Sequence, residues 1–230
     1  MWVVAMDWRD ALFLHWRVDA DALRRVLPPN LELDTYDGAA WVSIVAFRIT
    51  GARLRGMPPF AALPPFDEIN VRTYVRDQEK GGVWFFSLDA ANALAVLAAR
   101  TGLHLPYIYA RIDGSWRAGH CAYRSERTRD ADTARFSAEV SFGGAARHAA
   151  AGTLEQWLAE RYCFFTVDGR GRVMRGDVAH EPWPLQDATA TISANGLLSA
   201  AGIVALDAEP VAHASPGVST RAWPLRRAAL

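Results

Sequence analysis

The clearest pattern of hydrophobic and polar positions in the chain is the strict alternation over residues 66–77, FDEINVRTYVRD. Successive side chains of a strand point to opposite sides, so the segment is predicted to be a strand with two different faces. One face carries Ile69, Val71, Thr73 and Val75. The other carries Glu68, Asn70, Arg72, Tyr74 and Arg76.

Similar runs of aromatic and branched residues predict several more strands. They cover residues 11–18, 39–50, 81–90, 106–112, 119–127, 135–142, 162–167, 171–180 and 187–193. Short helices are predicted at 19–30, 92–102 and 152–162, with Asp19 and Thr153 as N-terminal caps and Gly102 as a terminator. The segment 51–65 contains four prolines and is predicted to be a long loop, a kind of segment that often carries function.

The order of these elements indicates the fold class. Many short strands with two or three inserted helices, and no internal repeat, predict an α+β protein that is mainly β. We expect a closed antiparallel β-barrel rather than alternating strand–helix units. A chain of 230 residues can form such a barrel as one domain over residues 1–230.

Composition narrows the function classes. The formal net charge is zero, which argues against dedicated binding of nucleic acid or an anionic membrane. The N-terminus lacks the features of a signal peptide, and the longest apolar stretch, AANALAVLAA, is too short to span a bilayer. We therefore expect a cytoplasmic protein whose partner is a small-molecule ligand, with homo-oligomerisation left open. Cys121 and Cys163 are expected to be free buried thiols.

Several common catalytic motifs are absent. The sequence has no G-x-S-x-G elbow, no P-loop and no dinucleotide-binding glycine fingerprint. Its six histidines are scattered without metal-binding spacing. No metal site and no cofactor are predicted.

The polar row of residues 68–74 is the strongest candidate site. In a closed barrel one face of each strand points inward, so this row can form the floor of a pocket. Arginine binds carboxylates with a planar fork and glutamate transfers protons, which suits a small anionic or carbonyl ligand. The alternatives are a solvated outer face or a buried salt-bridge network in a filled barrel.

Six segments in order resemble the YqjF-like family, an uncharacterised bacterial branch of the acetoacetate-decarboxylase-like barrels. They are residues 13–47 and the motifs FDEINVRTYV, FFSLDA, LPYIYA, LAERYCFF and HEPWPL. The resemblance covers nearly the whole chain and implies the barrel fold. For HEPWPL, a packing corner is favoured over a functional role.

The more distant resemblance to acetoacetate decarboxylases implies roles for single residues. Arg9 occupies the position of a pocket arginine, and Glu68 matches a pocket glutamate. No acid stands near residues 41–43, where a second pocket glutamate would fall. The position of the imine-forming lysine is taken by Tyr107, and that of its neighbouring lysine by Ile108.

The missing lysine excludes one chemistry. The chain has a single lysine, Lys80, in a predicted turn, against twenty-four arginines. Arginine stays protonated and cannot form an imine, so we expect no lysine-dependent decarboxylation. Two functions remain: an enzyme without imine chemistry, or a non-catalytic ligand-binding or sensor protein. In the first, Glu68 and Tyr107 are the catalytic candidates, and the substrate-binding candidates are Arg9, Asn70, Arg72 and Tyr74.

Overall fold

The computed structural model describes residues 1–128 and 133–230, and it is mainly β. The strands are β1 (Val4–Val18), β2 (Glu32–Leu33), β3 (Ala40–Leu54), β4 (Phe66–Arg76), β5 (Gly81–Ala90), β6 (Tyr107–Arg117), β7 (His120–Arg127), β8 (Arg135–Arg147), β9 (Cys163–Val167), β10 (Val173–His180), β11 (Leu185–Asn195), β12 (Val211–Ala222) and β13 (Arg226–Arg227). The helices are α1 (Ala20–Val26), the 3₁₀ helix η1 (Pro59–Ala61), α2 (Ala93–Gly102), α3 (Leu154–Ala159) and α4 (Gly196–Ala200).

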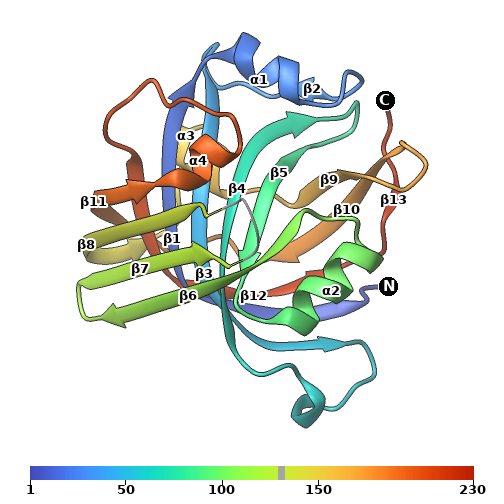
Figure 1. The fold of residues 1–230 in the computed structure, drawn as a ribbon, viewed down its shortest axis with the longest axis horizontal. Helices are drawn as coiled ribbons and strands as arrows, with labels where there is room; N and C mark the ends of the chain where they lie inside the picture. The colour runs from blue at the N-terminus through green and yellow to red at the C-terminus, as the bar shows by residue number, and fades with distance from the viewer. Residues whose placement is uncertain (129–132) are drawn as a thin grey trace.

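The strand pairings return on themselves. From β5 they run through β6, β7, β8, β11, β12, β1 and β3 to β4, which pairs with β5 again. A second route links β5 to β12 through β9 and β10. Strands β1, β3 and β4 are shared by the two routes. Figure 1 shows β6, β7, β8 and β11 on one side of these shared strands and β9 and β10 on the other. The shared strands β1, β3 and β4 therefore have neighbours on both faces.

Two details of the predicted fold are corrected. The sheet is not antiparallel throughout, because β5 pairs in parallel with β6 and with β9. Helix α2 lies in the connection from β5 to β6, and the connection from β5 to β9 runs through β6, β7, β8 and α3. Neither parallel pair is therefore joined by a tight turn, which parallel pairing excludes. The described residues also hold four α-helices rather than two or three, since α4 gives no long periodic pattern.

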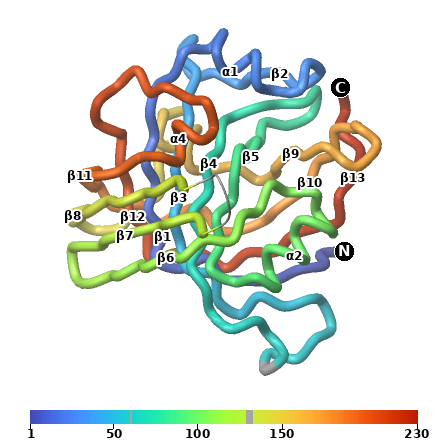
Figure 2. Tube along the Cα trace, viewed as in Figure 1, coloured from blue at the N-terminus to red at the C-terminus, as the bar shows by residue number. Residues whose placement is uncertain are grey.

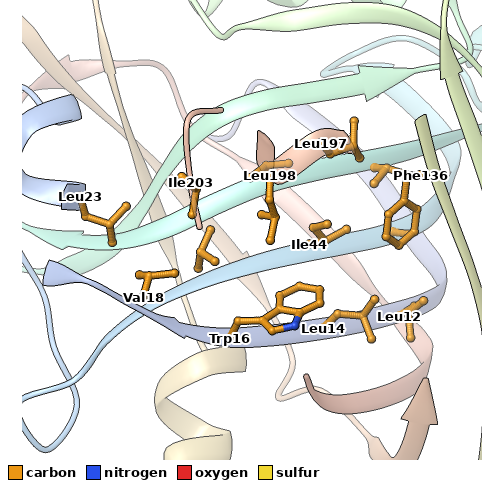
Figure 3. Close-up of a cluster of buried hydrophobic side chains, with 14 of the residues drawn as sticks. Leu12, Leu14, Trp16, Val18, Leu23, Ile44, Phe136, Leu197, Leu198 and Ile203 are labelled. Carbon is orange, nitrogen blue, oxygen red and sulfur yellow. The ribbon is translucent and has the colours of Figure 1, made fainter. Parts of the chain in front are cut away.

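One face of the shared strands packs into the largest apolar cluster. Leu14 of β1, Ile44 of β3 and Ile69 of β4 are buried there. Leu197 and Leu198 of α4 and Phe136 of β8 belong to the same cluster as Leu12 and Leu14, as Figure 3 shows. This cluster accounts for the apolar half of the alternation in β4, and it leaves the polar half facing the opposite side of the sheet.

Several strands extend beyond their predicted bounds: β1 begins at Val4 rather than at residue 11, and β8 ends at Arg147 rather than at residue 142. Strand β3 runs to Leu54, into the predicted loop, and the rest of that loop projects from the trace (Figure 2). Strand β12 was missed by the sequence analysis because it contains Pro216 and Gly217 without regular alternation. It is nevertheless central, pairing with β1, β10 and β11.

The two predicted N-terminal caps are confirmed, whereas Gly102 is the last residue of α2 and Leu103 forms its C-terminal cap. The Asp19 side chain accepts a hydrogen bond from the Ala22 amide at 2.6 Å, and Thr153 accepts one from Gln156. Both cysteines are free and buried, as expected. None of the helices in the described part of the chain has the length and hydropathy that a bilayer crossing needs.

Replacing Gly217 with alanine is expected to destabilise the fold strongly. Its φ of +114° disfavours a side chain, and a Cβ atom there would overlap the carbonyl oxygen of Trp8. We expect the free energy of unfolding to fall by at least about 3 kcal/mol in urea denaturation. Gly38, with a φ of +75° but no atom within 4 Å of its Cβ position, is the control. Its alanine variant should lose only about 1 kcal/mol, and equal losses would contradict the packing argument.

Candidate functional site

A cavity of about 120 Å³ lies on the polar side of β4. Apolar side chains form most of its wall: Met6, Trp8, Val45, Phe47, Ile49, Val83, Phe85, Leu88, Leu103, Leu105, Ala159, Phe164, Val178, Trp183 and Ala222. Its polar lining residues are Glu68, Asn70, Arg72, Tyr107, Arg161, Cys163, His180 and Thr220. The alternation in β4 thus places three of the six candidate site residues, Glu68, Asn70 and Arg72, in one cavity, and Tyr107 joins them from β6.

A bulge in β5 keeps apolar side chains on the cavity wall. Asn70 pairs with Leu88, the register shifts between Val71 and Arg72, and Arg72 then pairs with Phe85. One extra residue in β5 exchanges the two faces of the strand. As a result, Leu88 before the shift and Phe85 after it both line the cavity.

Glu68 and Tyr107 form a hydrogen-bonded pair. The Tyr107 hydroxyl donates to Glu68 Oε2 at 2.8 Å, and Glu68 is only 2% exposed. Burial raises the pKa of Glu68 to about 7, although hydrogen bonds from Tyr107 and Asn70 oppose the rise, and Asp89 adds to it. Burial and the Glu68 charge hold the pKa of Tyr107 well above its ordinary value. Glu68 can therefore exchange a proton near neutral pH, while Tyr107 remains a phenol.

Arg72 has no carboxylate partner among the described residues. Its Nη2 donates to the carbonyl oxygen of Leu158 at 3.3 Å, and its buried Nε has no hydrogen-bond partner. Its guanidinium carbon lies 6.0 Å from the ring centre of Phe13 and 6.0 Å from that of Tyr74. Burial lowers the pKa of Arg72, yet a guanidinium remains charged in proteins. A cation without a counter-charge in a small cavity favours an anionic ligand.

Tyr74 lies on the same face of β4 but does not line the cavity. It is fully buried, and its hydroxyl contacts Ser43 Oγ at 2.6 Å and donates to the Leu158 carbonyl at 3.1 Å. His15 Nδ1 lies 2.6 Å from the same Ser43 hydroxyl. Burial, with His213 and Arg72 nearby, holds the pKa of His15 well below its ordinary value. The expected ligand contact of Tyr74 is therefore replaced by a buried polar network beneath Arg72.

The expectation that Arg9 converges with Glu68 and Tyr107 is wrong. Arg9 is exposed, it pairs with Asp7 at 3.2 Å, and it does not line the cavity. In β1 the neighbouring Trp8 faces the cavity, so alternation turns Arg9 to the other side of the strand. The pocket role that the resemblance implies for Arg9 is therefore not met in this structure.

The lining residues that the sequence analysis did not name as site candidates include Arg161, His180 and Trp183. The HEPWPL segment contributes two of them, so this corner both packs and lines the cavity. Trp183 stacks on Trp8 with ring centres 6.0 Å apart, and its amide donates to Glu160 Oε1 at 2.8 Å. A His-x-x-Trp sequence has no general meaning, and one arginine among twenty-four gives no signal, so only the fold could identify these residues.

Lys80 and the proline-rich loop lie outside the cavity lining. The Lys80 ammonium donates to the Tyr162 carbonyl at 3.2 Å and lies 3.6 Å from Asp177. No residue of 51–65 lines the cavity. The polar chemistry of the cavity therefore comes from strand residues and from Arg161.

One cluster has the composition of a metal site. Ligand atoms of Glu155, Asp187 and His213 lie within 4.8 Å of one another. Arg147, however, donates two hydrogen bonds to Glu155, at 2.6 and 2.8 Å, and one to Asp187 at 2.8 Å. The arginine supplies the positive charge that brings the two acids together, so the cluster is explained as an ion-pair network.

Comparison with known proteins gives matches over nearly the whole chain. Residues 5–219 match the family model DUF2071, described as an uncharacterized conserved protein. The uncharacterized protein YqjF of Bacillus subtilis (strain 168) is 40% identical over 227 residues, which cover 99% of this chain and 93% of the relative.

Solved structures with the acetoacetate-decarboxylase-like fold are similar in shape. The enduracididine biosynthesis enzyme MppR complexed with pyruvate has a TM-score of 0.68 at 14% identity, over 98% of this chain and 90% of its own. Acetoacetate decarboxylase from Legionella pneumophila has a TM-score of 0.70 at 12% identity, over 99% and 87%. At these identities the likeness concerns the fold alone.

Replacing Glu68 with glutamine is expected to change how stability depends on pH. With a folded-state pKa of about 7 against an ordinary 4.5, this group's contribution to stability is complete below pH 4.5 and is lost as the pH rises through 7. Glutamine does not ionise, so the stability of Glu68→Gln relative to wild type should rise by on the order of 3 kcal/mol between acidic and mildly alkaline pH. Urea denaturation across this range measures the change.

Glu209, an exposed glutamate, provides the matched control. The difference in unfolding free energy between Glu209→Gln and wild type should stay constant with pH. If the Glu68→Gln difference were equally constant, Glu68 would not have the raised pKa.

Proposed function

The chain belongs to the DUF2071 family of uncharacterized conserved proteins, and we propose that it binds a small carbonyl or carboxylate compound in the cavity beside β4. The observation that carries this proposal is Arg72, a guanidinium at the cavity without a carboxylate partner among the described residues. We also propose that the second ring of pairings, from β5 through β9, β10, β12, β1 and β3 to β4, forms a closed barrel around the cavity, which would make the cavity wall rigid.

The size of the cavity limits the ligand. Its volume of about 120 Å³ is slightly smaller than that of a cavity of ~150 Å³ that takes up benzene. This supports a compound of roughly six non-hydrogen atoms. A short oxo acid has this size, and MppR, which shares the fold, has been described in complex with pyruvate.

The polar groups support proton transfer next to a carbonyl. Ionised Glu68 would remove a proton from the carbon beside the carbonyl, and the electron pair of that C–H bond would form the enolate. Arg72 would bind the developing negative charge. Tyr107 would hold the Glu68 carboxylate in position through its 2.8 Å hydrogen bond. While the enolate is bound, the proton on Glu68 would exchange with solvent, and Glu68 would then return a solvent-derived proton or deuteron to the carbon and restore the carbonyl. The exchange needs no cofactor and no lysine.

Binding and proton exchange can be measured separately. Wild-type protein should bind 2-oxobutyrate saturably in calorimetry and should catalyse exchange of the hydrogens next to its carbonyl with deuterium in ²H₂O, followed by NMR. Arg72→Gln should weaken binding at least about tenfold, because a hydrogen-bonded ion pair is lost. Glu68→Gln should keep most of the binding but slow the exchange by about 10²–10⁴.

Arg17 provides the control for Arg72, since it is an exposed arginine paired with Asp207 at 2.6 Å. Arg17→Gln should leave both binding and exchange unchanged. Saturable binding that depends on Arg72 but gives no exchange would favour the non-catalytic binding or sensor protein. No binding by the wild type would refute the proposal.

The protein is also expected to form no imine with an oxo acid. Incubation with acetoacetate followed by borohydride should leave the mass of the intact chain unchanged, because Tyr107 and Ile108 hold the positions that the resemblance assigns to lysines. Lys80, the only lysine, lies at an ion pair outside the cavity lining. An adduct that disappears in Lys80→Arg, together with release of carbon dioxide, would overturn this expectation.

A further inference from the structure

A second guanidinium, that of Arg161, lines the cavity and is fixed by its neighbours. Its Nη1 donates to Asp34 Oδ2 at 2.7 Å, and its Nε donates to the Trp157 carbonyl at 2.6 Å. The guanidinium carbon lies 4.2 Å from the ring centre of Trp157 and 4.8 Å from that of Tyr74. The side chain is 7% exposed, so the orientation of the planar fork is set before any ligand arrives.

One nitrogen of Arg161 remains without a partner. Its Nη2 is buried and makes no hydrogen bond to any described residue, as is also the case for Nε of Arg72. The two guanidinium groups lie near the same Tyr74 ring, at 4.8 and 6.0 Å, and the Arg161 charge contributes to lowering the pKa of Arg72. These two N–H donors are buried and belong to neighbouring cations that line one cavity, and each lacks an acceptor. A bound anion would accept a hydrogen bond from both guanidinium groups.

The charges around the cavity limit that anion to a single negative charge. Asp34 neutralises Arg161, whereas Arg72 has no acid partner among the described residues. Glu68, the only acid among the described lining residues, is largely protonated below a pH of about 7. Asp34, Glu68 and the two guanidinium groups then leave one positive charge uncompensated. A second negative charge on the ligand would stay unpaired, and most of the remaining wall is apolar.

Building on the proposed function, we propose that Arg161 and Arg72 together bind the anionic group of the ligand, so that the cavity selects monoanions with a short apolar chain. Arg161 is thus a second ligand-binding residue, and Asp34 sets the charge selectivity by neutralising it. The apolar end of the ligand would pack against the stacked rings of Trp8 and Trp183, which line the cavity.

The first experiment measures the affinity for propionate, a short monocarboxylate, by calorimetry at about pH 6. Arg161→Gln should weaken propionate binding at least about tenfold, the loss expected for a buried hydrogen bond to a charged group. Arg17→Gln, the exposed control, should change the affinity by less than about twofold. Circular dichroism and thermal melting show whether each variant is folded.

The second experiment changes the charge and keeps the arginine. Methanesulfonate and sulfate have nearly the same shape, but they carry one and two negative charges. Wild type should bind methanesulfonate more tightly. Asp34→Asn leaves the Arg161 charge uncompensated, so the affinity for sulfate relative to methanesulfonate should rise at least about threefold. This test stands even if Arg161→Gln does not fold.

The outcomes separate this inference from the proposed function. One outcome is that the wild type binds propionate, Arg72→Gln abolishes this binding and a folded Arg161→Gln variant keeps it. That result refutes the role of Arg161 and leaves the proposed function standing. An unchanged preference between the two anions in Asp34→Asn refutes the charge selectivity. If the wild type binds none of these anions, the inference and the proposed function both fail.

Discussion

The burial of strand β4 on both faces is the constraint on which the site depends. Ile69 and Val71 are fully buried in the large apolar cluster, so the same strand must turn Glu68, Asn70 and Arg72 toward the opposite side. That side is covered by β5, β9 and β10 and is not exposed to bulk solvent. Polar side chains that are removed from water cost free energy unless they find hydrogen-bond partners. In this row the hydrogen bonding is incomplete, and this determines which polar groups the cavity contains.

The partners differ in kind along the row. Glu68 has a phenol and an amide as hydrogen-bond partners, and its burial outweighs them and raises its pKa to about 7. Tyr74 has hydroxyl and carbonyl partners that fix it in the interior. Arg72 has a single carbonyl partner at 3.3 Å. Along β4, Glu68 is therefore a carboxyl group with a pKa of about 7, Arg72 is a cation whose hydrogen bonding is incomplete, and Tyr74 is a buried residue whose hydroxyl is hydrogen-bonded. The first two line the cavity and the third supports its floor.

The arrangement also shows how a fold can keep a polar cavity without a nucleophilic amine. Tyr107 begins β6 where the resemblance implies a lysine, and its hydroxyl bonds to Glu68 at 2.8 Å. A phenol in this place cannot form an imine, but it can orient a carboxylate. The neighbouring Ile108 does not line the cavity. The ionisable and cationic groups that line the cavity are consequently a carboxyl group, a phenol, an imidazole, a thiol and two guanidinium groups, with no amine among the described lining residues.

The sequence by itself determined the features that depend on local periodicity and capping. The alternation of residues 66–77 gave the strand and its two faces, and Asp19 and Thr153 marked the starts of helices. It also gave Glu68, Asn70 and Arg72 as one row, because side-chain direction in a strand follows from position alone. The tertiary structure decided the rest. Arg9 faces away from the cavity, whereas Arg161 and Trp183 line it from distant segments of the chain. Strand β12 forms although it contains Pro216. These outcomes depend on pairing between strands that are far apart in the chain, which the sequence pattern does not reveal.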